Sequence, residues 1–192
     1  MQNDVKVSDR YKAKYKSIDN ESFISIPSFP NKNMILEVTN RCNHNCIFCY
    51  HYKMTTRQCD IDENLAIRVI HEAYELGMRE IGFSKSGEPF LNSNLNQYIN
   101  EAHNTGYEYI YLTTNGQLVT KERLKSAVES GLNSIKFSIN AVNKRDYEFI
   151  HGVDAFEIVL QNLRDAYSYR KESGNKFKIF VSYVETKYTI KS

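Results

Sequence analysis

The chain has 192 residues, of which 41% are hydrophobic and 25% are charged, and its formal net charge at pH 7 is +2. This length predicts one globular domain with a substantial core and excludes two ordinary domains. The near-neutral charge gives no reason to expect nucleic acid or an anionic membrane as the main partner. Because no apolar run approaches the ~20 residues of a membrane span and no secretory signal is recognisable at the N-terminus, we expect a cytoplasmic protein.

Residues 1–33 are polar and are predicted to form a leader or packing arm ahead of a core over residues 34–192. Within the core, segments rich in β-branched and aromatic residues alternate with segments of helical periodicity. The predicted strands cover residues 34–39, 79–84, 107–113, 134–139 and 177–184. The predicted helices cover residues 62–76, 95–105, a segment that Thr120 caps and that ends at Gly131, and a segment through 156–163. Asp154 and Glu157 have capping-box spacing at the start of the last helix.

The alternation of strands and helices predicts an α/β fold with a parallel sheet. In the fourth predicted strand Ile135 and Phe137 point to one face, whereas Lys136 and Ser138 point to the other. Strands that lie between two helical layers are apolar on both faces. One polar face therefore predicts a curved, incompletely closed sheet, a partial (β/α) barrel with a wet interior.

All four cysteines lie in an irregular segment, residues 40–60, directly after the first predicted strand. Clustered cysteines in a cytosolic chain bind metal or do chemistry more often than they form disulfides. Cys42, Cys46 and Cys49 have spacings of four and three residues, so three thiolates can converge on one metal centre. A four-iron cluster held by three cysteines keeps one iron open for another ligand.

Zinc is the alternative occupant of these cysteines, with His44, His51 or Cys59 as a fourth ligand. On this sequence Cys59 has no matching partner and is predicted to be a spare thiol, and the two histidines are predicted to be ordinary loop residues. The segments that follow the other predicted strands decide between iron and zinc.

The Cys-x3-Cys-x2-Cys pattern after the first strand resembles the hallmark of the radical S-adenosylmethionine (radical SAM) superfamily. Further segments match that family's motifs in the same order, at the ends of successive predicted strands. They are 86–89 (SGEP, similar to Gly-Gly-Glu-Pro), 113–116 (TTNG, similar to Thr-Asn-Gly), 138–141 (SINA, similar to Ser-Ile-Asp-Ala), and 150–152 (IHG) followed by 156–163. The resemblance covers residues 34 to about 187.

The resemblance implies an oxygen-sensitive enzyme with a [4Fe–4S] cluster on Cys42, Cys46 and Cys49, which are also its catalytic cysteines. S-adenosylmethionine would bind the open iron and be cleaved reductively to methionine and a 5′-deoxyadenosyl radical, which abstracts hydrogen from a substrate. The substrate classes that the resemblance suggests are peptides and carbohydrate-like small molecules. A flavodoxin-type or ferredoxin-type protein is the expected electron donor.

The resemblance also implies a set of residues around S-adenosylmethionine. Phe48 is expected to pack on adenine, and the backbone at Gly87 and the carboxylate of Glu88 are expected to receive the methionyl ammonium. Ser138 and Asn140 are expected to contact the ribose and carboxylate, although Asn140 stands where an Asp is frequent. The implied cofactor-binding residues are Phe48, Gly87, Glu88, Pro89, Asn115, Ser138 and Asn140, with Thr114 a weaker candidate.

The chain departs from the family pattern at its C-terminal side. The family usually completes its barrel with a sixth strand, and only about five are recognisable here, which predicts a truncated barrel or a fragment. The motifs look closest to members with a SPASM extension, yet no cysteine follows Cys59 to bind an auxiliary cluster. Two other classes therefore stay open: a zinc-stabilised binding domain without catalysis, and an inactive remnant.

Overall fold

The structure is a computed structural model that describes residues 32–185. The predicted arm over residues 1–33 lies outside the described residues except for its last two positions, and Asn33 already belongs to the first strand. Among residues 32–185, no helix is both long enough and apolar enough to cross a membrane.

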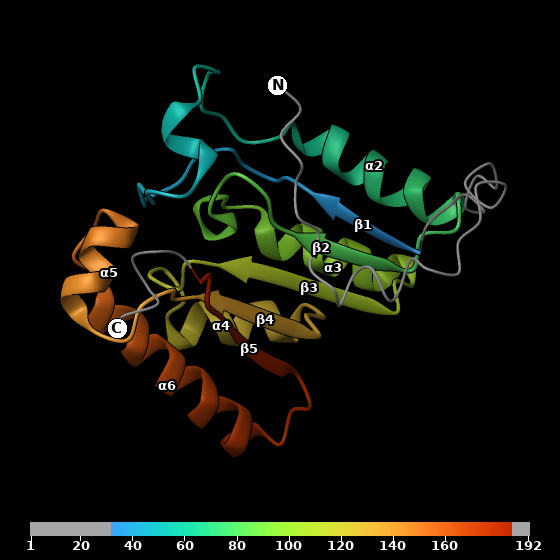
Figure 1. Ribbon diagram of the computed structural model, residues 1–192. Helices are drawn as coiled ribbons and strands as arrows, with labels where there is room; N and C mark the ends of the chain where they lie inside the picture. The colour runs from blue at the N-terminus through green and yellow to red at the C-terminus, as the bar shows by residue number, and fades with distance from the viewer. Residues whose placement is uncertain (1–31, 186–192) are drawn as a thin grey trace, which may run out of the picture. The chain divides into compact units, whose positions relative to one another are not determined.

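Five parallel strands form one sheet, and each strand pairs with the next one along the chain (Figure 1). The strands are β1 (Asn33–Leu36), β2 (Glu80–Phe83), β3 (Tyr109–Thr114), β4 (Ser134–Ser138) and β5 (Lys178–Ser182). The strand order is β1-β2-β3-β4-β5, and within the described part of the chain β1 and β5 are the two edges. The predicted α/β fold with an open parallel sheet is confirmed, and the arrangement is consistent with a partial barrel.

Four helices connect the strands and form one layer. They are α2 (Glu63–Glu75), α3 (Leu95–Thr105), α4 (Lys121–Glu129) and α6 (Phe156–Ser173). Consecutive members pack on one another, and Figure 1 shows α3 and α4 behind the strands. The register aligns Leu36, Phe83 and Leu112 across the sheet, and all three are buried in the core. Apolar burial of this kind is the main stabilising contribution of the fold.

The opposite face of the sheet has mostly polar side chains, as predicted, although Ile35 and Phe180 are exposed on it. Tyr111 lies on this face and donates a hydrogen bond to Asn33 Oδ1 (2.9 Å), and its ring covers Gly82. A Cβ atom at Gly82 would lie 2.3 Å from the Tyr111 ring, so only glycine fits beneath it. Tyr109, Tyr111, Thr113, Lys136 and Phe180 are among the residues that line an open cavity of about 270 Å³ over this face.

Several element boundaries agree with the sequence. The helix predicted over 95–105 is α3, and the predicted cap Thr120 accepts a hydrogen bond from the Arg123 amide (3.4 Å) at the start of α4. The predicted first strand is shorter than expected, because β1 ends at Leu36 and Thr39 forms an isolated antiparallel bridge to Asp60 instead.

The predicted capping box before α6 is wrong. The N-cap residue is Ala155, which has no side chain to accept a hydrogen bond, and Asp154 forms an ion pair with Lys144 (3.0 Å) instead. Lys144 begins α5 (Lys144–His151), a helix that the sequence did not predict. Two short 3-10 helices were also missed: η2 (Tyr50–Lys53) and η3 (Pro89–Leu91).

Candidate cysteine site

The four cysteines lie in a loop, residues 40–60, that we call the cysteine loop. Figure 1 shows this loop (cyan) at the end of the sheet to which the arrows of β1, β2 and β3 point, with α5 (orange) at the same end. Segments 86–89 and 138–141, singled out in the sequence, follow β2 and β4 at that end, whereas 113–116 begins within the last residues of β3. Active sites on parallel barrels lie at this carboxyl end of the strands.

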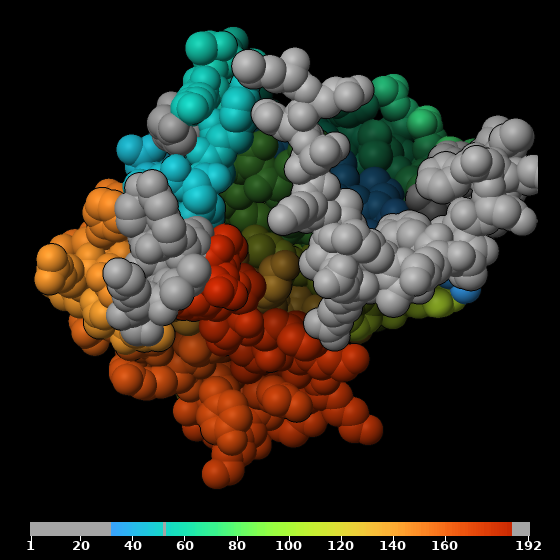
Figure 2. Space-filling view, viewed as in Figure 1, coloured from blue at the N-terminus to red at the C-terminus, as the bar shows by residue number. Residues whose placement is uncertain are grey.

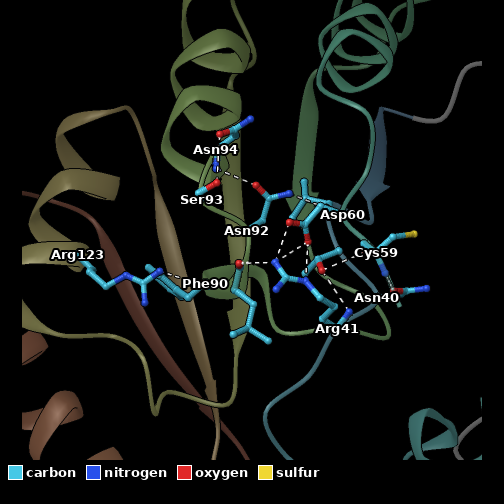
Figure 3. Close-up of polar contacts among 12 residues, drawn as sticks. Asn40, Arg41, Cys59, Asp60, Phe90, Asn92, Ser93, Asn94 and Arg123 are labelled. Atoms are coloured by element: carbon cyan, nitrogen blue, oxygen red, sulfur yellow. Dashed lines mark hydrogen bonds and ion pairs between the residues drawn. The ribbon is translucent and has the colours of Figure 1, made fainter. Parts of the chain in front are cut away.

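The two ends of the cysteine loop are joined by hydrogen bonds, and we call these segments, residues 39–41 and 59–61, the neck. The Asn40 amide donates to the Cys59 carbonyl (3.2 Å), and the Cys59 amide donates to Asn40 Oδ1 (2.7 Å). Figure 3 shows this contact at the base of the loop. The neck holds the loop in one place relative to the sheet, because the backbone polar groups on both sides have partners.

Arg41 ties the neck to the segment after β2. Its guanidinium donates to the Asp60 carboxylate and to the Leu91 carbonyl, both at 2.7 Å, as Figure 3 shows. Its own carbonyl accepts from the Glu88 amide (2.8 Å). Arg41, which directly precedes Cys42, therefore fixes the distance between the cysteine loop and the segment that contains Glu88.

Cys42, Cys46 and Cys49 are half-buried free thiols, whereas Cys59 is exposed. Burial raises the pKa of Cys42 above its ordinary value. Burial, together with the nearby thiols of Cys42 and Cys49, raises the pKa of Cys46 to about 12. The thiols of Cys42, Cys46 and Cys49 thus influence one another's pKa, as expected of side chains in one short loop.

Gly87 lies against the neck so closely that no side chain fits there. A Cβ atom at Gly87 would lie 2.2 Å from the Thr39 carbonyl oxygen and 2.7 Å from the Arg41 carbonyl oxygen. The next proline, Pro89, is buried and begins η3. Gly87 therefore allows the backbone of the segment after β2 to lie directly against the start of the cysteine loop.

The Glu88 side chain is buried, with 2% of its surface exposed, and it is surrounded by donors from its own chain. Its carboxylate accepts hydrogen bonds from Thr114 Oγ1 (2.8 Å), the Asn115 amide (2.7 Å) and the Phe90 amide (3.1 Å). Burial raises the pKa of this carboxyl, and the hydrogen bonds oppose that rise. Glu88 thus joins the end of β3 to η3, a contribution that the sequence did not reveal.

Of the other predicted cofactor residues, Phe48 lies within the cysteine loop and Asn115 lies beside it. Phe48 is 42% exposed, and its ring centroid lies 6.3 Å from that of His151. The Asn115 amide group donates to Asn43 Oδ1 (2.7 Å) within the loop. Both side chains are therefore placed where a ligand on the loop could reach them, and their roles stay predictions.

The remaining two, Ser138 and Asn140, lie toward β5. Ser138 Oγ accepts from Ser182 Oγ (3.3 Å). Asn140 is 1% exposed, adopts a left-handed backbone with φ of 54°, and accepts a hydrogen bond from the Val184 amide (2.9 Å). Contacts of these two residues with a cofactor stay predictions, because both side chains already have partners within the chain.

Two histidines that the sequence did not single out as functional lie next to Cys46. His44 and His151 are 5% and 1% exposed, and His151 Nδ1 lies 3.2 Å from Cys46 Sγ. Burial lowers the pKa of His44 to about 4, with a further contribution from His151, and burial also lowers the pKa of His151. Two signals in the sequence pointed to these histidines: His44 lies two residues before Cys46, and His151 belongs to the 150–152 segment that resembles the family pattern.

Backbone hydrogen bonds fasten the cysteine loop to α5. The Asn45 amide donates to the His151 carbonyl (3.0 Å), and the Ile47 amide donates to the Ile150 carbonyl (2.9 Å). Figure 2 shows the loop (cyan) beside α5 (orange) at the surface. The 150–152 segment that the sequence singled out therefore supports the cysteine loop from α5, at the same end of the sheet.

The sequence pattern of the Radical SAM superfamily matches residues 36–190. The chain belongs to the Radical SAM superfamily. Members of the Radical SAM superfamily bind a [4Fe–4S] cluster and S-adenosylmethionine, and three neighbouring thiols are a suitable donor set for such a cluster.

Among curated Radical SAM relatives is a probable GTP 3′,8-cyclase of Methanothermobacter thermautotrophicus, 30% identical over 71% of this chain and 44% of its own length. Another is the tungsten-containing aldehyde ferredoxin oxidoreductase cofactor-modifying protein of Pyrococcus furiosus, 27% identical over 83% of this chain and 45% of its own length. The chain thus spans less than half of the length of these relatives.

Solved Radical SAM structures share the fold. SuiB of Streptococcus suis bound to S-adenosylmethionine has a TM-score of 0.68 and 19% identity, over 93% of this chain and 38% of that chain. BtrN in complex with AdoMet and 2-DOIA has a TM-score of 0.59 and 18% identity, over 79% of this chain and 56% of that chain. At these identities the likeness concerns the fold alone.

Proposed function

We propose that the chain is the catalytic core of a radical SAM enzyme in which Cys42, Cys46 and Cys49 bind the [4Fe–4S] cluster and leave one iron open for S-adenosylmethionine. The observation that carries this proposal is that three half-buried cysteines, spaced four and three residues apart, lie in one loop at the carboxyl end of the sheet. When bound, the cluster and S-adenosylmethionine supply a 5′-deoxyadenosyl radical for hydrogen abstraction from a substrate.

The protein's own residues position and shield this site. The neck and Gly87 fix the loop against the segment after β2. Glu88 holds that segment to β3, so its first contribution is to position the backbone that we expect to receive the methionyl ammonium. The exposed ring of Phe48 is available to pack on adenine, and the Asn115 side chain borders the loop.

The substrate is proposed to be a peptide or a carbohydrate-like small molecule that enters over the polar face of the sheet. The cavity along Tyr109, Tyr111 and Lys136 supports a polar substrate, because it offers hydroxyl groups and one cation. One relative is a probable GTP 3′,8-cyclase, which is named for a small molecule, and one SuiB structure is bound to its precursor peptide. A flavodoxin-type or ferredoxin-type protein is the proposed electron donor.

The test is anaerobic reconstitution of the full chain with iron and sulfide, followed by dithionite and S-adenosylmethionine. We expect 5′-deoxyadenosine from the unaltered protein and from Cys59→Ala, which changes the exposed cysteine of the same loop. Cys49→Ala should produce none. A cluster that assembles but does not cleave S-adenosylmethionine would identify an inactive remnant. A colourless protein loaded only with zinc would identify a binding domain, and either result overturns the proposal.

A further inference from the structure

Three potential metal ligands converge in one buried cluster beside Cys42 and Cys49. His44 Nδ1 lies 3.3 Å from His151 Nδ1, and Cys46 Sγ lies 3.2 Å from the same His151 nitrogen. All three ligand atoms lie within 4.8 Å of one another. We call His44, Cys46 and His151 the imidazole–thiol cluster. It shares only Cys46 with the cysteines proposed to bind iron and sulfide.

The tautomer of His151 follows from its backbone partner. His151 Nε2 lies 2.7 Å from the Ile139 carbonyl oxygen, which can only accept a hydrogen bond. Nε2 therefore has the proton of the neutral ring. The lone pair of Nδ1 then points toward the Cys46 sulfur and the His44 ring.

The tautomer of His44 follows from a chain of amide groups that starts at an unambiguous donor. The backbone amide of Gln117 donates to Asn115 Oδ1 (3.0 Å), so Asn115 Nδ2 is the donor to Asn43 Oδ1 (2.7 Å). Asn43 Nδ2 then donates to Gln117 Oε1 (2.8 Å), which fixes that oxygen as the acceptor for His44 Nε2 (3.0 Å). His44 Nδ1 therefore also presents a lone pair.

Two lone pairs thus face each other across 3.3 Å in a buried place, and among residues 32–185 the contacts of His44 Nδ1 include no hydrogen-bond donor. A Cys46 thiol can donate one proton to His151 Nδ1, but this leaves the His44 nitrogen without a proton. A cation between the nitrogens removes the repulsion. The spacing suits one, because tetrahedral zinc ligands lie about 3.3 Å apart for two nitrogens and about 3.6 Å apart for nitrogen and sulfur.

The surroundings of the imidazole–thiol cluster are those of a metal site. Each histidine donates the N–H of its second ring nitrogen to a carbonyl oxygen, the usual arrangement that orients a metal-binding imidazole. The Tyr147 ring stacks on His151 with centroids 4.2 Å apart and meets His44 edge-on at 6.1 Å. Among the described residues, the buried Tyr147 hydroxyl is the buried side-chain polar atom without a hydrogen-bond partner. This apolar wall excludes water from the two imidazoles.

We infer that, in the cluster-free protein, His44 Nδ1, His151 Nδ1 and Cys46 Sγ bind a divalent cation of the zinc type. The cation joins the cysteine loop to α5 and occupies the Cys46 thiolate, so it excludes the iron–sulfur cluster from that sulfur. Binding releases the thiol proton to solvent, and no electron is transferred. The site is therefore an alternative to the proposed cluster rather than a part of it.

The test uses the full chain with Cys42→Ala and Cys49→Ala together, which removes two of the three proposed iron ligands and keeps the imidazole–thiol cluster. Cobalt(II) is the probe, because tetrahedral cobalt with a thiolate ligand absorbs visible light. We expect one equivalent of cobalt to bind with thiolate charge-transfer and tetrahedral absorption bands, and zinc to displace it. Loss of cobalt binding in this double variant would assign the metal to the three cysteines and overturn the inference.

His44→Gln on the double-variant background should weaken cobalt binding by at least about tenfold. His71→Gln is the matched control, because His71 is a half-exposed histidine on α2 that pairs with Glu101. X-ray absorption of the zinc-loaded double variant gives a second readout that does not depend on the folding of His44→Gln. One sulfur and two imidazole nitrogens are expected, and any other count of sulfur or imidazole overturns the inference. None of these measurements requires the iron–sulfur cluster, so they succeed or fail independently of the proposed enzyme.

Discussion

The neck and the tip of the cysteine loop differ in how their polar groups are used. At the neck, both amide groups of Asn40 and the guanidinium of Arg41 have close partners within the chain. At the tip, which we define as residues 42–49, the thiols are half-buried and have weaker sulfur contacts, such as the hydrogen bond from the His51 amide to Cys49 Sγ (3.4 Å). Polar groups that already have hydrogen-bond partners within the chain hold the loop in place, and we call these groups the frame. Groups that lie close together and can still accept a partner are able to bind a ligand.

The largest expected effect is a loss of bound iron when a cysteine of the tip is replaced and the neck is left unchanged. Cys42→Ser should lose most of the iron that the unaltered chain retains after anaerobic reconstitution, because a serine hydroxyl is a poor ligand for the cluster. Cys59→Ser changes the neck cysteine and should retain the iron. Iron content and visible absorbance are the measurements, and full iron retention in Cys42→Ser would show that tip and neck cysteines do not differ.

A methyl group at Gly87 tests the close contact between the neck and the segment after β2. Gly87→Ala places a Cβ atom 2.2 Å from the Thr39 carbonyl oxygen, and we expect the free energy of unfolding to fall by about 2–3 kcal/mol. Gly174→Ala is the control: no atom lies within 4 Å, although φ is 65°, so it should cost only about 1 kcal/mol. Urea denaturation of the cluster-free chains measures both, and equal losses would contradict the close packing at Gly87.

Glu88→Gln asks whether the buried carboxylate belongs to the frame. An amide NH2 group in place of one carboxylate oxygen would face a donor, because Thr114, Asn115 and Phe90 all donate to Glu88. We expect a loss of about 1–2 kcal/mol in the free energy of unfolding. The exposed Glu129, which pairs with Lys125 one helical turn away, should tolerate Gln with a change below about 0.5 kcal/mol.

Had Glu88 acted only through cofactor contact, Glu88→Gln would weaken S-adenosylmethionine binding with no loss of stability. Calorimetric titration of the reconstituted chain separates the two contributions. Unchanged stability together with unchanged binding would remove Glu88 from both the frame and the site.

The smallest expected effect concerns the ion pair of the neck. Arg41→Lys should cost about 0.5 kcal/mol, because the Arg41–Asp60 pair is partly exposed and surface ion pairs contribute little. Arg68→Lys is the comparison on α2, where the pair with Glu72 is more exposed and should contribute almost nothing. Denaturation in low and high salt checks both. A loss above about 2 kcal/mol for Arg41→Lys would show that the Leu91 contact, rather than the ion pair, dominates.

Local patterns in the sequence predicted most of the fold. Apolar periodicity predicted α3 over its observed residues, and Thr120 caps α4 as its position suggested. The helix α5 was missed although Asn143 caps it by accepting a hydrogen bond from the Asp146 amide, because its 8 residues span only about two turns and give a short signal. The same local reading placed a cap at Asp154, which tertiary context uses for an ion pair.

The candidate site was predictable only in part. The spacing of Cys42, Cys46 and Cys49 is local, so the sequence could predict that the thiols gather. The partners of Glu88 lie at the end of another strand, and His151 reaches Cys46 only after the sheet has formed. Such contacts depend on the register of strands and the placement of α5, which no single segment encodes.

The contact between Cys46 and His151 joins positions 105 residues apart, whereas every strand pairs with its immediate predecessor or successor in the chain. During synthesis the strands can dock one after another, each onto a neighbour already made. At the ordinary pace of translation, roughly 5–20 s pass between the emergence of Cys46 and that of His151. Throughout this interval the Cys46 thiol leaves the ribosome without its α5 partner, so its contact with His151 can form only after the fourth strand and α5 have been made.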